Sequence, residues 1–118
     1  MQLKLNDRAV DGVYVVDCSG RIVFGEEGAL LRDRVKQIIA ANKRVLLNLA
    51  EISYIDSGGL GTLVALRTSA YNAGTSLRLA SLTKRVGDVM QITKLLTVFD
   101  VYNSEAEALA AFRKESAA

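Results

Sequence analysis

Ser57 is the residue whose setting in this sequence points most directly to chemistry. It lies in the segment 55–61, Ile-Asp-Ser-Gly-Gly-Leu-Gly, between an apolar segment at 45–49 and residues with the apolar spacing of a helix. A hydroxyl at the start of a helix lies at the positive end of the helix dipole, where the first backbone N–H groups have no partner within the helix. Anions are favoured at such a position. The segment could therefore bind a phosphate or carry one.

The same segment also has a purely structural interpretation. Asp and Ser are preferred N-cap residues, because their side chains accept hydrogen bonds from the first helical turn. A cap leaves the glycines unexplained, since each costs up to about 1 kcal/mol in a helix relative to Ala. Glycines there would keep the backbone open to a phosphate, a nucleotide or a protein partner. The candidate partner-binding residues of this segment and of the next position are Asp56, Ser57, Gly58, Gly59, Gly61 and Thr62.

Two nucleotide-binding patterns that contain glycines were compared with the segment. A P-loop requires a Lys-Ser/Thr pair after its last glycine, whereas Gly61 is followed by Thr62 and Leu63. The dinucleotide-binding fingerprint would need a third glycine at Val64 and an acidic residue at the end of the next strand. The sequence has neither feature, so we expect no nucleotide cofactor.

The composition excludes several classes of function. A chain of 118 residues suits one domain, 1–118, and a net charge of +2 with no basic cluster longer than Lys84-Arg85 disfavours direct nucleic-acid binding. No apolar run has the length of a membrane span and the N-terminus has no signal-peptide pattern, so we expect a cytoplasmic protein that does not bind membranes. Without histidine, Ser-His-Asp catalysis and histidine-ligated metals are excluded, and we predict neither an enzyme nor a metal site. Cys18, the only cysteine, should pack as a small apolar residue.

The apolar pattern predicts strands that alternate with helices. Alternation implies parallel strands joined by right-handed crossovers, and the β-rich start adds at least one antiparallel strand. We therefore predict a single α/β domain, with a mixed, mainly parallel sheet of four to six strands and about four helices packed mostly on one face. The expected strands are 3–5, 12–18, 21–24, 45–49, 77–80 and 98–102, with turns at 6–7 and 19–20. The expected helices are 30–42, one that begins in the segment 55–61 and is stopped by Gly74, 84–95 and one that begins after Ser104.

Two further residues have both a structural and a functional interpretation. Asn48 is either a satisfied polar group near the end of its strand or a neighbour of Ser57 at the same rim of the sheet, where ligands of parallel sheets gather. Met90 and Ile92 lie in a helix that is apolar around much of its circumference. They belong either to the core or to an exposed apolar strip that binds a protein, so Met90 is added to the candidate partner-binding residues.

The chain resembles the STAS domains of bacterial anti-sigma factor antagonists. The segments that carry the resemblance are 45–49, 54–61, 77–80 and 94–102, followed by 104–109, and Asp-Ser-Gly-Gly-Leu is its most specific part. The resemblance implies that an anti-sigma factor with serine kinase activity phosphorylates Ser57. It also implies that the unphosphorylated protein binds this kinase and frees a sigma factor, and that a PP2C-type phosphatase restores the unphosphorylated form.

Two positions differ from the family pattern. Arg21 stands where an acidic residue usually follows the turn into the third strand, and Asn48 stands where Asp is common; the next acids are Glu26 and Glu27. Together with the apolar helix around Met90, Arg21 motivates an alternative function, a non-switching STAS scaffold subunit of a larger signalling or lipid-transport complex. For the antagonist itself we expect a monomer or a weak dimer.

Overall fold

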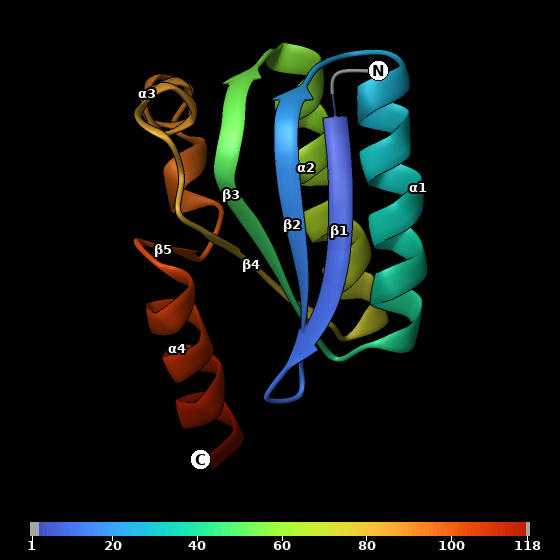
Figure 1. Ribbon diagram of the computed structural model, residues 1–118, viewed down its shortest axis with the longest axis vertical. Helices are drawn as coiled ribbons and strands as arrows, with labels where there is room; N and C mark the ends of the chain where they lie inside the picture. The colour runs from blue at the N-terminus through green and yellow to red at the C-terminus, as the bar shows by residue number, and fades with distance from the viewer. Residues whose placement is uncertain (1–2, 118) are drawn as a thin grey trace.

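The chain folds into a five-stranded mixed sheet with helices on both faces (Figure 1). The computed structural model describes residues 3–117, with side chains described up to residue 115. Strands β1 and β2 are antiparallel, every other neighbouring pair is parallel, and the strand order is β1-β2-β3-β4-β5. The elements are β1 Leu3–Val10, β2 Val13–Ile22, α1 Glu26–Ala41, β3 Arg44–Ile55, α2 Ser57–Ala73, β4 Ser76–Ala80, α3 Lys84–Ile92, the 3-10 helix η1 Leu95–Thr97, β5 Val101–Tyr102 and α4 Glu105–Ala117. The predicted fold class is confirmed.

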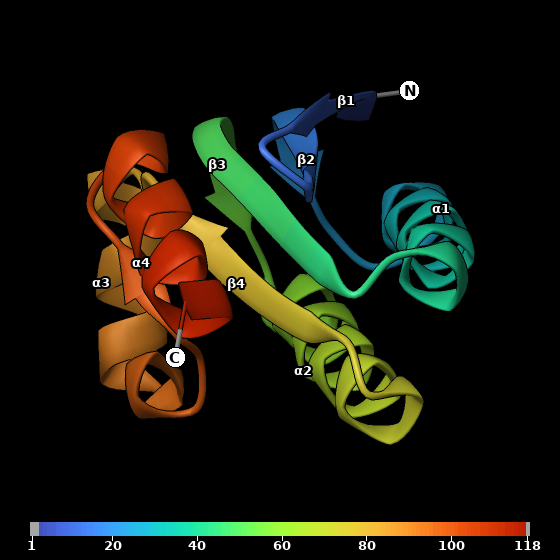
Figure 2. The same cartoon turned by 90° about the horizontal axis from the view of Figure 1, so that it is seen from below.

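Two hydrophobic clusters hold the layers together. The larger one lies between the sheet and helices α1 and α2, and α3 adds the buried side chains of Val86 and Met90 to it. Helix α4 packs on the opposite face, as Figure 2 shows from below. It closes a smaller cluster made of Val13, Val15, Leu46, Ala80, Ala108, Leu109 and Phe112. Strand β3 is covered on both faces, which explains why its first half is almost entirely apolar.

The first hairpin differs from the sequence prediction. Residues 6–7, which were expected to form a turn, lie inside β1, and the turn is made by Asp11 and Gly12, with φ of 51° and 79°. Two central residues with positive φ are typical of the tight turns that suit the twist of a hairpin. Residues 19–20, which were expected to form a second turn, lie within β2. The pairing of β2 with β3 shifts register twice around these residues. A bulge accommodates such residues without ending the strand, so the expected strand at 21–24 is the end of β2 and the loop after it.

Several ends of helices and strands also differ from the predicted ones. Strand β3 continues six residues beyond the predicted end, with Ile52 and Ile55 buried, and α1 begins four residues earlier than predicted, at Glu26. Helix α3 ends at Ile92, whose side chain is 80% exposed, so Ile92 is not part of the core. No helix within the described residues is long and apolar enough to cross a membrane.

Candidate functional site

Ser57 is the first residue of α2 and is exposed at the end of β3. The N-cap is Asp56, whose carboxylate accepts a hydrogen bond from the backbone N–H of Gly59 at 2.7 Å. The same carboxylate accepts the N–H of Phe24 at 3.1 Å, which ties the loop between β2 and α1 to the start of α2. The capping interpretation is therefore confirmed for Asp56. Because Asp56 supplies the cap, the hydroxyl of Ser57 is not required for it.

Close packing explains two of the three glycines. A Cβ on Gly58 would lie 2.6 Å from Cβ of Phe24, and a Cβ on Gly59 would overlap the carbonyl oxygen of Ile22. Both glycines let the first turn of α2 approach the end of β2 and the loop after it. Gly59 is buried, so the interpretation that it leaves the backbone open to a ligand is wrong, whereas Gly58 is only half-buried. A Cβ on Gly61 would meet nothing within 4 Å, and this residue does face open space.

A groove runs between α1 and α2 on one side of Ser57. Its volume is about 500 Å³, and its lining includes Phe24, Gly28, Arg32, Gly58, Gly61 and Thr62. The Phe24 side chain is 84% exposed, which is unusual for a large apolar residue. The hydroxyl of Thr62 donates to the carbonyl of Gly58, so it is already engaged within the helix. The sequence analysis missed Phe24 because it assigned this residue to a strand.

Three exposed residues from three elements lie together near the end of β3, and we call them the Arg21–Tyr54–Arg85 row. Arg21 of β2 lies opposite Tyr54 of β3 in the sheet, and both are exposed. The guanidinium carbon of Arg85 lies 5.5 Å from the centre of the Tyr54 ring. The start of α3 is fixed beside β3 because the hydroxyl of Thr83 donates to the carbonyl of Ile52 at 2.9 Å. Arg21, which stands where the resemblance led us to expect an acid, thus lies beside an aromatic side chain and a second basic residue.

Two predicted site residues lie elsewhere. Met90 has no exposed surface and belongs to the core, so its assignment to a partner-binding surface is wrong. Asn48 is seven residues from the end of β3, or about 23 Å along the strand, so it does not share a rim with Ser57. The prediction failed at Asn48 because β3 is longer than its apolar pattern indicated.

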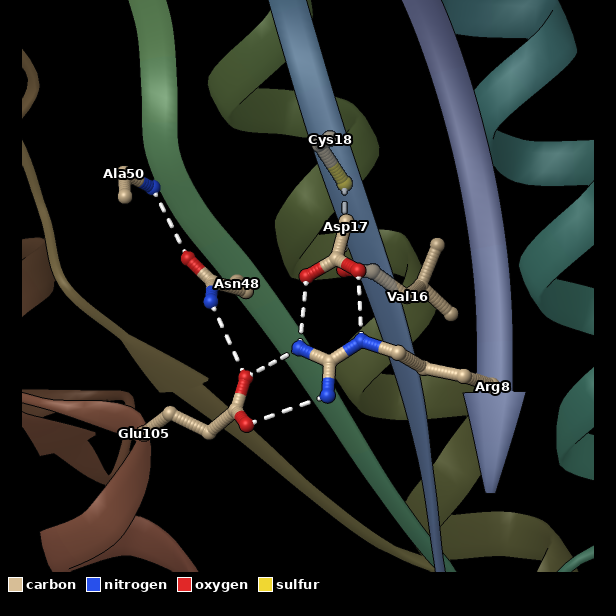
Figure 3. Close-up of polar contacts among 7 residues, drawn as sticks. All are labelled: Arg8, Val16, Asp17, Cys18, Asn48, Ala50 and Glu105. Atoms are coloured by element: carbon tan, nitrogen blue, oxygen red, sulfur yellow. Dashed lines mark hydrogen bonds and ion pairs between the residues drawn. The ribbon is translucent and has the colours of Figure 1, made fainter. Parts of the chain in front are cut away.

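Asn48 instead belongs to a polar network under α4, which we call the Arg8–Glu105 network (Figure 3). Arg8 of β1 donates to both carboxylate oxygens of Asp17, at 2.7 and 3.0 Å, and to those of Glu105 in α4. The side chain of Asn48 donates to Glu105 at 3.2 Å and accepts the N–H of Ala50 at 3.0 Å. Hydrogen bonds from Arg8 hold the pKa of Glu105 below its usual value. The expectation that the side chain of Asn48 is a satisfied polar group is therefore confirmed, whereas its expected position near the end of the strand is wrong.

Among the residues that the structure describes, the candidates for thiol and metal chemistry are the single cysteine and the acidic side chains that could bind a metal. Cys18 is buried, its thiol donates a long hydrogen bond of 3.7 Å to the carbonyl of Val16, and burial raises its pKa to about 12. A thiol that stays protonated is a poor nucleophile, as expected for a packing residue. Within residues 3–117, no three Cys, Asp or Glu side chains are grouped as metal ligands.

Comparison with known proteins places this arrangement in a family. The family model of the STAS domain matches residues 4–108. A relative from Bordetella bronchiseptica, "Putative anti-sigma factor antagonist BtrV", is 28% identical over 111 residues, which cover 94% of this chain and 96% of the relative.

The solved structure of an anti-sigma factor antagonist from Mycobacterium paratuberculosis has a TM-score of 0.81 at 22% identity, and the match covers 94% of each chain. That of the anti-sigma factor antagonist SpoIIAA in its unphosphorylated form has a TM-score of 0.77 at 18% identity and covers 94% of this chain and 97% of its own. At these identities the two structures establish a shared fold. Because the family model spans most of its length, the chain belongs to the STAS domain family.

Proposed function

We propose that this protein is an anti-sigma factor antagonist that acts in the cytoplasm. In the unphosphorylated form it binds an anti-sigma factor and thereby releases a sigma factor. The observation that carries the proposal is the exposed Ser57 at the first position of α2, in a turn whose cap is supplied by Asp56. The relative BtrV, which matches nearly the whole chain, carries the name of such an antagonist.

Phosphorylation of Ser57 would switch binding off. A phosphoserine adds a charge of about −1.5 to −2, which the dipole of α2 stabilises within the free protein. The same charge must be desolvated when a partner covers it, so the complex loses stability. The anti-sigma factor would itself be the serine kinase, and a PP2C-type phosphatase would restore the unphosphorylated form.

The partner would cover the start of α2 and the groove beside it. Asp56, Ser57, Gly58, Gly61 and Thr62 remain in the proposed partner-binding surface, and Gly59, which is buried, contributes by positioning the turn. We add Phe24, because an exposed aromatic side chain beside a groove is the kind of residue that dominates binding energy.

Phosphate mapping tests the assignment of Ser57. The protein is incubated with ATP and its cognate anti-sigma kinase, and the phosphorylated peptide is identified by mass spectrometry. We expect phosphate on Ser57 and none on the Ser57→Ala variant. Phosphate on the neighbouring Ser53 or Thr62 instead, or no phosphate at all, would contradict the assignment.

Arg21 favours a second candidate, the non-switching scaffold. A basic residue replaces the acid of the family pattern beside the site, and the exposed Ile92 on α3 offers an apolar contact for a larger assembly. Sedimentation of the protein with and without the kinase separates the two functions. The antagonist should be a monomer or weak dimer that forms a complex with the kinase, whereas a persistent large assembly without a kinase complex would favour the scaffold.

A further inference from the structure

We propose that the Arg21–Tyr54–Arg85 row binds an acidic surface of the anti-sigma factor, and that phosphorylation of Ser57 acts partly by neutralising this basic row. The inference rests on the proposed function, because it takes the partner to be an anti-sigma factor. It adds the chemistry of the contact surface and the physical nature of the switch.

The geometry of the row suits carboxylate groups. Its two guanidinium groups come from different elements, one from the end of β2 and one from the first turn of α3, and Tyr54 lies between them. The planar guanidinium fork matches a carboxylate with two parallel hydrogen bonds. The ring of Tyr54 holds Arg85 in place and offers a flat apolar contact between the two charges.

The charges around the row leave it basic. The carboxylate of Asp56 carries a single negative charge, which two arginines outnumber, and it is bound to two backbone N–H groups. Lys84 and Asp88 form an ion pair with each other at 2.8 Å. The nearest other acids in the sequence are Asp17, which binds Arg8, Glu51, which lies opposite Ser19 further back in the sheet, and Glu26, which lies two residues after Phe24 at the start of α1. Arg21 at the end of β2 and Arg85 at the start of α3 are exposed and therefore accessible to a partner.

Phosphorylation would cancel this charge. The Cα atoms of Tyr54 and Ser57 are at most about 11 Å apart, and Arg21 and Arg85 lie beside Tyr54. A charge on Ser57 is therefore about one Debye length from the centre of the row, since that length is about 10 Å at 0.1 M salt. A phosphoserine of about −1.5 to −2 thus offsets the two arginines and removes the attraction for an acidic surface. A switch that worked only by obstruction would depend little on salt, whereas a switch of this kind weakens as salt rises.

Association kinetics with the anti-sigma kinase test the row. We expect Arg21→Glu and Arg85→Glu each to lower the association rate constant about tenfold at 50 mM salt, and much less at 1 M salt, because charges at an interface act mainly by steering. Arg67→Glu is the matched control: Arg67 is exposed, and it lies ten residues along α2, about 15 Å from Ser57. It should leave the rate unchanged. Unfolding midpoints check that each variant is folded, and Arg21→Gln and Arg85→Gln should show smaller effects in the same direction.

A second pair of variants tests the switch itself. Ser57→Asp and Ser57→Asn have nearly the same shape, so the difference between their dissociation constants reports charge. We expect this difference to be large at 50 mM salt and to shrink at 1 M salt. If it persists at 1 M salt, or if the glutamate variants bind as fast as the wild type while Ser57→Asp still weakens binding, the inference fails and the proposed function stands. If the unmodified wild type does not bind the anti-sigma kinase at any salt concentration, both fail.

Discussion

Asp56 and Ser57 are adjacent but have different tasks. The carboxylate of Asp56 binds the backbone N–H groups of Gly59 and Phe24, which fixes the turn, and the hydroxyl of Ser57 is exposed on it. The sequence alone points to both residues, because a cap and a modifiable serine are local features. It does not assign the glycines correctly, because the reason for Gly58 and Gly59 lies in residues 22–24, more than 30 positions earlier in the chain.

Gly59 and Gly61 provide a matched test of this packing. Gly59→Ala should lower the free energy of unfolding by about 1–3 kcal/mol, because its Cβ would overlap the carbonyl of Ile22 and force the turn to move. Gly61→Ala should raise it by about 0.5–1 kcal/mol, because its Cβ meets open space within a helix. Urea unfolding of both variants measures the two changes. Similar changes of the same sign would show that α2 does not approach β2 as described.

At the scale of elements, α4 is attached to the sheet in two ways. Its apolar face covers the smaller hydrophobic cluster, and Glu105 at its first position joins the Arg8–Glu105 network. The helix and its start after Ser104 could be predicted from a local capping pattern, and the N–H of Glu107 indeed donates to Ser104 at 3.1 Å. The network could not be predicted, because Arg8 and Glu105 are 97 residues apart in sequence.

The network makes the attachment of α4 dependent on pH. The pKa of Glu105 is lowered in the folded protein, so its stabilisation is present above the pKa of the unfolded chain and is lost as pH falls through the folded value. At pH 7, Glu105→Gln should lower the free energy of unfolding by about 1 kcal/mol, a value reduced because Arg8 is partly exposed. Glu105→Gln should also speed up the hydrogen exchange of backbone amides in α4 more than in α2.

The control is Asp88→Asn, which breaks the exposed ion pair with Lys84 and should leave the free energy of unfolding nearly unchanged, because solvent screens this pair. The difference between the wild type and Glu105→Gln should shrink as pH falls from 7 to 3, because the stabilisation by the Glu105 carboxylate is lost as pH falls through its lowered pKa. A difference of equal size at pH 7 and pH 3 would mean that the charge of Glu105 does not hold α4.

At the scale of the whole molecule, the fold places two different surfaces near the start of α2. The groove with Phe24 is lined by the first turns of α2, and the Arg21–Tyr54–Arg85 row is centred on Tyr54, three residues before Ser57. The radius of gyration is 13.0 Å, the value of a compact chain of this length. Alternating strands and helices predicted the mixed sheet, because crossover rules restrict the topology. The surfaces around Ser57 could not be predicted, because they combine residues from β2, β3, α1, α2 and α3.

The release of a sigma factor from its anti-sigma factor is the measurement that tests the central claim most directly. The protein is titrated into a preformed complex of the two, and free sigma factor is measured. We predict that the unphosphorylated protein displaces the sigma factor, and that the protein phosphorylated on Ser57 needs at least about tenfold higher concentration, because a buried phosphate must be desolvated. No displacement by the unphosphorylated protein, or equal displacement by both forms, would contradict the account.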